Sequence, residues 1–393
     1  MPKRIYLDYA ALTPIDPRVT AEMKKHSGAA YGNPSSLYKE GVAAKKVLEN
    51  SRKVVGDFIH AHKDEIYFTS GGTEANNLAI IGAVESLRKK GMEYSDMHVI
   101  ISAVEHSSVI EVANHLSDRE VRVEKISVEP SGVVSLEDLR RKIRPNTVVV
   151  SIMTVNNEIG TIQPIRDIAK IIRDARDASA KTSIFNFQSS IKYPLFHTDA
   201  AQAALYEDLD VQSLGVDLLT LDASKVYGPR GIGALYVKRG VPLEPIVYGG
   251  GQENGIRSGT ENIPPIAGFA KALEIAAAEK GREGVRLILL KKLFMELMRK
   301  LNRDIKENGG STSPNILNVS IPNIDSEYFI IQLDVKGIAC STKSSCLHDQ
   351  DESYVLKAIG ANSRTSVRFS MGRWTKRADV VATVKAIRAI LTD

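Results

Sequence analysis

The stretch that decides the fold of this chain is T220-L-D-A-S-K-V-Y-G-P-R-G-I-G-A-L-Y236. The apolar run Leu218–Leu221 predicts a strand, a single lysine follows in a turn, and a glycine-rich segment leads into a second strand. Apolar neighbours surround Lys225, and a lysine withdrawn from water loses proton affinity. Its neutral amine can then form a Schiff base with a carbonyl compound. The competing interpretation is a lysine that merely closes a surface hairpin.

The composition is that of an ordinary globular protein. The chain has 393 residues, a length natural for two domains, with 43% hydrophobic and 25% charged residues. A net charge of +5 is mild for this length and gives no case for nucleic-acid binding. There is no apolar window of about 18 residues and no apolar N-terminal signal segment, so we expect no membrane association. The only cysteines are Cys340 and Cys346, which argues against a disulfide scaffold and for a reducing, cytoplasmic location.

Residues 60–240 alternate short apolar runs with amphipathic stretches. This alternation predicts an α/β fold with a mostly parallel sheet and helices on both sides. The run Val148–Met153 is apolar without alternation, as in strands that are buried on both faces. The expected strands lie at 66–68, 99–101, 121–126, 148–153, 195–196 and 218–221, and the expected helices at 35–61, 74–89, 107–116, 135–143 and 165–176.

The pattern changes after Pro264-Pro265. A long helical stretch runs from 266 to about 305, and we expect interruptions near Gly281 and Gly284. Strands at 316–321 and 366–370, with helices at 326–334 and 376–391, then indicate a smaller α+β domain. We therefore predict a large domain over residues 14–263, and a small domain over residues 264–393 together with residues 1–13.

Several strand ends of the large domain carry polar residues, and ligand sites in open α/β sheets collect beyond the carboxyl ends of strands. A Gly71-Gly72 turn at a helix start exposes backbone N–H groups that suit an anion. His106 can stack on a flat ring, and Asn156-Asn157 add two amides. Each feature alone is also explained by an ordinary polar turn. Their order along the chain makes a common crevice the better interpretation.

Asp199 completes this set. An acid at the end of a buried strand is costly unless it has a cationic partner. The pyridinium nitrogen of pyridoxal 5′-phosphate (PLP) is such a partner, and a Schiff-base lysine with a carboxylate on that nitrogen is the usual protein contribution to PLP chemistry. Lys225 and Asp199 together therefore predict a PLP site.

With these residues in view, the chain resembles the cysteine desulfurases of the NifS/IscS type, which are fold-type I PLP enzymes of the class-V aminotransferase family. The resemblance covers nearly the whole chain. Its motifs are L7-D-Y-A-A-L-T-P14, G32-N-P-S-S36, T69-S-G-G-T-E74, E105-H106, V155-N-N-E-I-G160, H197-T-D-A-A-Q202, S224-K-V-Y-G-P229, G249-G-G-Q-E253, R257-S-G-T260 and S366-V-R-F-S-M-G-R373.

The resemblance implies a role for each matching residue. Lys225 binds PLP covalently and moves the Cα proton of the substrate, and His106 stacks on the ring as a further catalytic group. The remaining cofactor contacts would come from Gly72, Thr73, Asn157, Asp199, Gln202, Ser224 and Thr260. Thr260 would reach the neighbouring subunit of a homodimer. The substrate L-cysteine would contact Asn33, Asn157 and Arg368, with Arg368 clamping its carboxylate. No metal is implied.

Cys346 matches the cysteine that accepts sulfur in these enzymes. Its surroundings, C340-S-T-K-S-S-C346-L-H-D-Q-D-E352, are polar and predict a loop. Lys343 and His348 can lower the pKa of its thiol, and the thiolate is the nucleophile. The resemblance implies a persulfide on Cys346 that passes to an iron–sulfur cluster scaffold or another sulfur-acceptor protein. Cys340 follows an apolar run and is interpreted as a small buried hydrophobe.

The chain departs from the family just before Lys225, where the usual Ser-Gly-His is replaced by Asp222-Ala223-Ser224. Ser224 can still donate a hydrogen bond to the cofactor phosphate. An ionised Asp222 would repel it, so we expect Asp222 to point away, or phosphate binding to depend on Thr73, Thr260 and the helix start. Residues 178–194 also look longer than usual and predict a surface excursion.

Two other functions remain open. A related PLP lyase or aminotransferase, including a selenocysteine lyase, would keep the fold and change the chemistry. A degenerate homologue could instead serve as a non-catalytic platform in a sulfur-transfer complex, which the residues at 222 and 224 motivate. The presence of Lys225, Asp199 and Cys346 argues for the enzyme.

Overall fold

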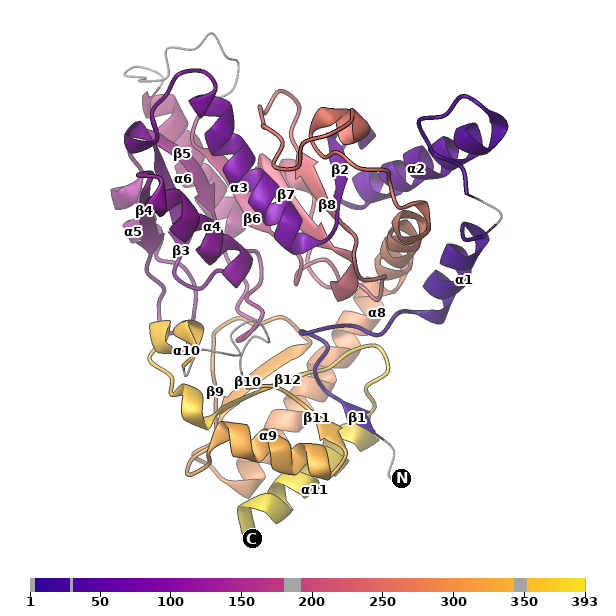
Figure 1. The fold of residues 1–393 in the computed structure, drawn as a ribbon. Helices are drawn as coiled ribbons and strands as arrows, with labels where there is room; N and C mark the ends of the chain where they lie inside the picture. Colours follow the sequence, from indigo (N-terminus) through magenta and orange to yellow (C-terminus); the bar gives the residue numbers. More distant parts are fainter. Residues whose placement is uncertain (1–3, 29–30, 180–191, 343–351, 393) are drawn as a thin grey trace.

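The larger part of the protein is built on one seven-stranded sheet (Figure 1). The computed structural model describes residues 4–28, 31–179, 192–342 and 352–392. The strand order is β2-β8-β7-β6-β5-β3-β4, parallel from β7 to β4, with β8 antiparallel to both of its neighbours. The strands are β2 (Ile66–Thr69), β3 (His98–Ser102), β4 (Arg122–Ile126), β5 (Thr147–Ser151), β6 (Leu195–Asp199), β7 (Leu218–Asp222) and β8 (Gly233–Val237).

Helices cover both faces of this sheet because successive strand residues point to opposite sides. Ile100, Val150 and Phe196 face a core that includes residues of α2 and α6, whereas Val99 and Val149 face a second core formed with α3 and α4. The predicted mostly parallel α/β fold is therefore confirmed. The helices of this part are α1 (Pro17–Lys25), α2 (Lys39–Phe58), α3 (Gly72–Arg88), α4 (Ser107–Asp118), α5 (Leu136–Lys142), α6 (Ile165–Ser179) and α7 (Val211–Leu214).

A smaller antiparallel sheet of order β12-β10-β9 lies at the other end of the molecule (Figure 1). The N-terminal strand joins this end, because β1 pairs in parallel with β11 and Leu7 packs in the same core as Phe369. The elements of this end are β1 (Ile5–Tyr6), β9 (Lys306–Glu307), β10 (Ile316–Ser320), α9 (Ser326–Val335), β11 (Ile338–Ala339), α10 (Tyr354–Ala358), β12 (Ser366–Ser370) and α11 (Arg377–Thr392).

One continuous helix, α8 (Ile263–Leu301), connects the two ends. The expected interruptions near Gly281 and Gly284 are wrong. A Cβ at either position would meet nothing within 4 Å, and a helical glycine costs only about 1 kcal/mol relative to alanine. Residues of α8 up to Ala276 pack in the core of the large sheet, and those from Leu287 onward in the core of the small one. The domain boundary at 263/264 stays a prediction.

No helix in the described ranges is both long enough and apolar enough to cross a membrane.

Candidate active site

A cavity of about 190 Å³ lies beyond the carboxyl ends of the central strands. It collects residues that follow five different strands, as expected for an open α/β sheet. Ala10 and Ala11 from the N-terminal segment and Asp222 from the end of β7 also line it. The predicted site residues in its lining are Gly72, Thr73, His106, Asn157, Asp199, Gln202, Lys225 and Arg368.

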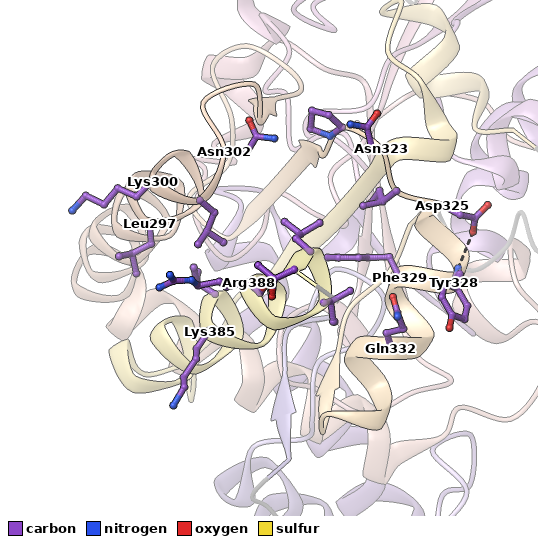
Figure 2. Close-up of a pocket in the computed structure, with 17 residues that line it drawn as sticks. Leu297, Lys300, Asn302, Asn323, Asp325, Tyr328, Phe329, Gln332, Lys385 and Arg388 are labelled. Carbon is purple, nitrogen blue, oxygen red and sulfur yellow. Dashed lines mark hydrogen bonds between the residues drawn. The ribbon is translucent and has the colours of Figure 1, made fainter.

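A larger hollow, of about 930 Å³, lies between the C-terminal end of α8, α9 and α11 (Figure 2). Its rim carries Lys300, Lys385 and Arg388, and Leu297 and Phe329 contribute apolar surface. It contains none of the residues predicted for the site. Because it lies in the small part and does not border the central strand ends, we place the active site at the smaller cavity.

Lys225 ends a short turn, Ala223–Lys225, that directly follows β7. Its Nζ donates to the carbonyl oxygen of Ala11 at 2.5 Å and of Ala10 at 3.3 Å. The side chain of Gln202 also donates to the Ala10 oxygen, at 2.8 Å. The N-terminal segment therefore fixes the position of the amine through its backbone.

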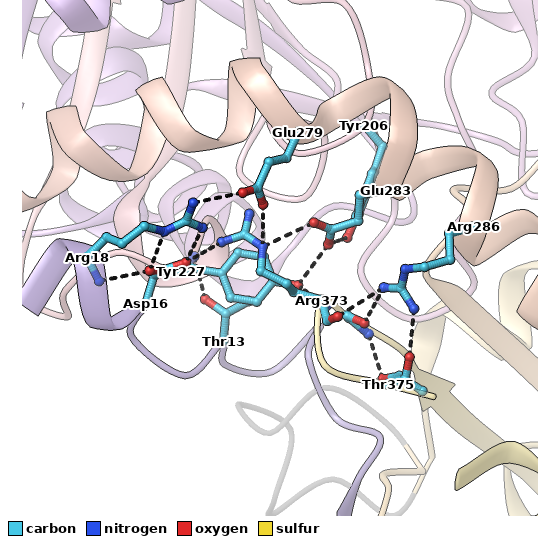
Figure 3. A network of polar contacts seen from close by, with 11 residues as sticks. Thr13, Asp16, Arg18, Tyr206, Tyr227, Glu279, Glu283, Arg286, Arg373 and Thr375 are labelled. Carbon is cyan, nitrogen blue, oxygen red and sulfur yellow. Dashed lines mark hydrogen bonds and ion pairs between the residues drawn. The ribbon is translucent and has the colours of Figure 1, made fainter. Parts of the chain in front are cut away.

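Tyr227, two residues after Lys225, holds this turn in place (Figure 3). Its backbone adopts a positive φ of 62°, which is unusual for a tyrosine. Its N–H donates to Oγ1 of Thr13 at 2.8 Å, and its carbonyl accepts from the N–H of Asp16 at 3.0 Å. The phenol oxygen accepts from the N–H of Arg373 at 2.7 Å and lies 3.2 Å from Oε1 of Glu283.

Arg373 joins this turn to α1 and α8. Its guanidinium lies over the Tyr227 ring, 4.1 Å from the centroid, and pairs with Asp16 at 2.7 Å and Glu283 at 3.1 Å (Figure 3). Arg18 donates to Asp16 and lowers the pKa of that carboxyl to about 2, so it stays ionised beside Arg373. The loop carrying Lys225 is thus held by residues from both ends of the molecule.

Asp199 and His106 belong to one chain of hydrogen bonds. The Nδ2 of Asn76 donates both to Oδ2 of Asp199 and to Oγ of Ser108, each at 2.8 Å. Ser108 Oγ lies 2.8 Å from Nδ1 of His106, and Oδ1 of Asp199 accepts from the N–H of Ala201 at 2.9 Å. Both carboxylate oxygens of Asp199 are therefore held by donors.

This chain also fixes the tautomer of His106. Ser108 Oγ accepts from Asn76, so its own proton points to Nδ1 of His106, which also accepts from the N–H of Ser108 at 3.2 Å. The proton of a neutral His106 ring therefore sits on Nε2. The sequence prediction did not include Asn76 or Ser108. Their signal was their position in the first turn or two of a helix that follows a site strand.

Glu105, the residue before His106, is fully buried. Its Oε1 accepts from Oγ of Ser102 at 2.5 Å and from the N–H of Met153 at 2.9 Å. Burial, with the nearby charge of Asp199, raises the pKa of Glu105 to about 8. Glu105 is thus protonated at neutral pH and adds no charge near Asp199.

Asp222 does not point away from the site. It lines the cavity, and its Oδ2 accepts from the N–H of Gly72 at 3.1 Å while its Oδ1 accepts from the N–H of Ser224 at 2.8 Å. The expectation that Asp222 points away from the site is therefore wrong. The N–H groups of Gly72 and Ser224 have no other acceptor among the described residues, and the cost of leaving them unpaired exceeds the tendency of a carboxylate to face water.

Arg368 is 1% exposed and comes from the middle of β12. Its Nη1 donates to the carbonyl of Asn157 and its Nη2 to Oδ1 of Asp8, both at 2.8 Å. Its Nε is buried and has no hydrogen-bond partner among the residues that the structure describes. Cys340 packs at the edge of the small core, as expected, and burial raises the pKa of its thiol to about 12, so it stays protonated.

Three predicted residues lie outside the cavity lining. Ser224 is partly buried beside it, and Thr260 is exposed on the segment before α8. Asn33 is exposed, and its Oδ1 accepts from the N–H of Ser35 at 2.9 Å. Their roles stay predictions. Cys346, with Lys343 and His348, falls outside the described residues, as does most of the 178–194 segment.

Comparisons with known proteins agree on the family. The model of the class-V aminotransferases matches residues 5–382. A cysteine desulfurase IscS of Dictyoglomus turgidum is 37% identical over 398 residues, covering 100% of this chain and 95% of the relative. The chain belongs to the class-V aminotransferases, in the cysteine desulfurase branch. A mitosomal cysteine desulfurase of Trachipleistophora hominis is 40% identical over 397 residues, covering 98% of this chain and 85% of that protein. A solved NifS-like protein superposes with a TM-score of 0.88 at 32% identity, covering 99% of this chain and 100% of the other.

Enzymes of this family depend on PLP, and the cavity residues of this desulfurase fit the group. Asp199 is 7% exposed, and its two oxygens accept from neutral donors, Asn76 Nδ2 and the Ala201 N–H, so this carboxylate would suit a protonated ring nitrogen. Lys225 and Asp199 lie at the ends of neighbouring parallel strands, β7 and β6, and line one cavity. His106 lines the same space. Only Asp222 disagrees, because it places a carboxylate where the phosphate is expected.

Proposed function

We propose that this chain is a PLP-dependent cysteine desulfurase that converts L-cysteine to L-alanine and transfers the sulfur to Cys346. The observation that carries the proposal is the cavity that unites the amine of Lys225, the carboxylate of Asp199 and the guanidinium of Arg368. The names of the relatives support the choice of substrate.

Bound PLP supplies an electron sink for the bond to Cα. Lys225 is suited to take the Cα proton, because its Nζ sits inside the cavity and is oriented by two carbonyl oxygens. Asn76 and the Ala201 N–H fix the orientation of the Asp199 carboxylate, which would hold a protonated ring nitrogen of PLP. Arg368 offers a buried guanidinium to the substrate carboxylate, and its unpartnered Nε suits such an acceptor.

The sulfur step needs no external oxidant. The thiolate of Cys346 attacks the sulfur of the bound cysteine, so that an S–S bond forms as the Cβ–S bond breaks. The electron pair of the broken bond stays on the carbon skeleton, which takes up a proton and leaves as alanine. The carbon is reduced and the two sulfurs are oxidised to a persulfide, so cysteine plus thiol gives alanine plus persulfide.

The finer assignments are part of the proposal. Thr260 is exposed, as a residue that completes the phosphate site of the neighbouring subunit in a homodimer would be. The persulfide passes to an iron–sulfur scaffold or another sulfur-acceptor protein. The small number of cysteines suits the cytoplasm.

The test compares the only two cysteines of the chain. The protein is incubated with PLP and L-cysteine, and alanine and a persulfide on Cys346 are assayed. We expect Cys346→Ala to abolish both products, whereas Cys340→Ala, the matched control, retains them because the Cys340 thiol stays protonated at the edge of a core. Alanine production that persists in Cys346→Ala would refute the desulfurase assignment. A protein that binds no PLP would support the non-catalytic platform instead.

A further inference from the structure

Asp222 performs a structural task at the start of α3. Gly71, the residue before the helix, has a φ of 152° and no side chain with which to cap the helix. Asp222, 150 residues further along the chain, supplies the missing acceptor to the N–H of Gly72. Its second oxygen caps the turn that carries Lys225, through the N–H of Ser224. One carboxylate thus ties the helix start to the lysine turn.

The same helix start is the predicted seat of the PLP phosphate. Exposed N–H groups at a helix N-terminus attract anions, and Gly72 and Thr73 line the cavity together with Asp222. Asp222 is therefore a negatively charged group of the protein itself, and it occupies the Gly72 N–H, a donor that would otherwise be available to the phosphate. A Cβ at Gly72 would lie 3.2 Å from Oδ2 of Asp222, which shows how closely the carboxylate approaches this turn.

Two cationic side chains, Lys225 and Arg368, line the same cavity as Asp222. Arg368 pairs with Asp8, and Lys225 donates to the carbonyls of Ala10 and Ala11. Asp199 adds a second negative charge at the opposite, ring-nitrogen end of the predicted cofactor site. Two anions at contact distance in a poorly solvated pocket repel strongly.

We propose that Asp222 competes with the phosphate of PLP for the N-terminus of α3, so that this chain holds its cofactor more weakly than it would with a neutral residue at 222. The inference rests on the proposed function only in taking PLP as the cofactor. The carboxylate keeps α3 and the lysine turn capped before PLP arrives and must yield a donor to the phosphate when PLP binds. Position 222 thereby sets the affinity for the cofactor.

The experiment measures PLP binding rather than catalysis. Protein freed of PLP is titrated with PLP, followed by absorbance, and separately with inorganic phosphate as a competitor. We expect Asp222→Asn to lower the Kd for PLP at least tenfold and to make phosphate a stronger competitor. Asp210→Asn is the matched control, because Asp210 also caps a helix, at Gln212 and Ser213, but lies outside the cavity. Its Kd should equal that of the unmodified protein.

An Asp222→Asn variant that binds PLP with unchanged or weaker affinity would overturn the proposal. Asp222→Ser provides a second test should the first variant fold poorly, and it must shift the Kd in the same direction. Thermal unfolding adds a further readout. Without PLP the Asn variant should melt below the unmodified protein, and PLP should raise its Tm by more. If PLP binds more tightly but no alanine forms from cysteine, the proposed function fails while this inference stands.

Discussion

Replacing Tyr227 by phenylalanine tests whether the phenol oxygen stabilises the junction between the two ends of the molecule. Tyr227 is 1% exposed, and phenylalanine fills the same space without the hydroxyl. The stacking of Arg373 on the ring at 4.1 Å and the edge contact with Trp374 at 5.3 Å are therefore retained. Only the polar contacts of the oxygen are lost.

The magnitude follows from which groups lose a partner. The backbone N–H of Arg373, which donates to the phenol at 2.7 Å, would be left without its acceptor. A buried donor without a partner costs about 1–3 kcal/mol. Glu283 still accepts hydrogen bonds from Tyr206 Oη at 3.2 Å and from Arg373 Nε at 3.1 Å, so the loss of its contact with Tyr227 adds little to the destabilisation. We expect Tyr227→Phe to lower the free energy of unfolding by about 2 kcal/mol.

Urea unfolding followed by tryptophan fluorescence measures this loss, since Trp374 is the only tryptophan and lies at the junction. The midpoint should fall while the m-value stays constant. Tyr94→Phe is the control, because that hydroxyl contacts Glu85 and Arg119 near the surface. Its effect should stay within about 0.5 kcal/mol. A Tyr227→Phe protein as stable as the control would refute the assigned role of the phenol.

Two further predictions concern buried polar groups near the site. Burial lowers the pKa of His197 in the folded protein to about 3. The contribution of the neutral side chain to the free energy of unfolding is therefore complete above its pKa in the unfolded chain, about 6.5, and is lost as the pH falls toward 3. Urea unfolding at pH 7 and pH 5 gives the free energy of unfolding that each protein loses between the two pH values. This loss should be smaller in His197→Gln than in the unmodified protein, by up to about 1.4 kcal/mol per pH unit below 6.5. Equal losses in the two proteins would contradict the prediction. Asn76→Ala removes a hydrogen bond to the charged Asp199, and we expect PLP affinity to fall roughly tenfold in absorbance titrations. Asn77→Ala, whose amide reaches only the Thr73 carbonyl, should bind PLP normally, and a matching loss there would exclude a specific role for Asn76.

The strand ends were predictable from the sequence because parallel strands bring their carboxyl ends to one edge. His106, Asp199 and Lys225 each follow an apolar run, and all three line the cavity. Ala10 and Ala11 could not be found in this way, since they act through carbonyl oxygens that every residue possesses.

Other features depended on contacts between distant residues. Asn76 reaches Asp199 across 123 positions. Its place early in a helix that follows a site strand marks Asn76 as a candidate, but it does not indicate Asp199 as the partner. The charge of Asp222 was visible, but the two N–H groups that attract it were not, so electrostatics alone suggested the wrong direction. Gly281 and Gly284 do not interrupt α8 as predicted, because the packing of α8 against both cores keeps the helix continuous through them.

The pairing of Asp8 with Arg368, 360 positions apart, has a consequence for the time at which the cavity can form. The N–H of Ala10 also donates to Oγ of Ser370, and the N–H of Ser370 donates to the carbonyl oxygen of Leu7. The N-terminal residues can therefore form these contacts only after the C-terminal part of the chain has been synthesised. Contacts of such long sequence separation form slowly. The strands of the large sheet can assemble while the ribosome is still extending the chain. The guanidinium of Arg368 reaches its place only after β12 has emerged, so the substrate recognition that we propose for Arg368 is among the last properties that the nascent protein acquires.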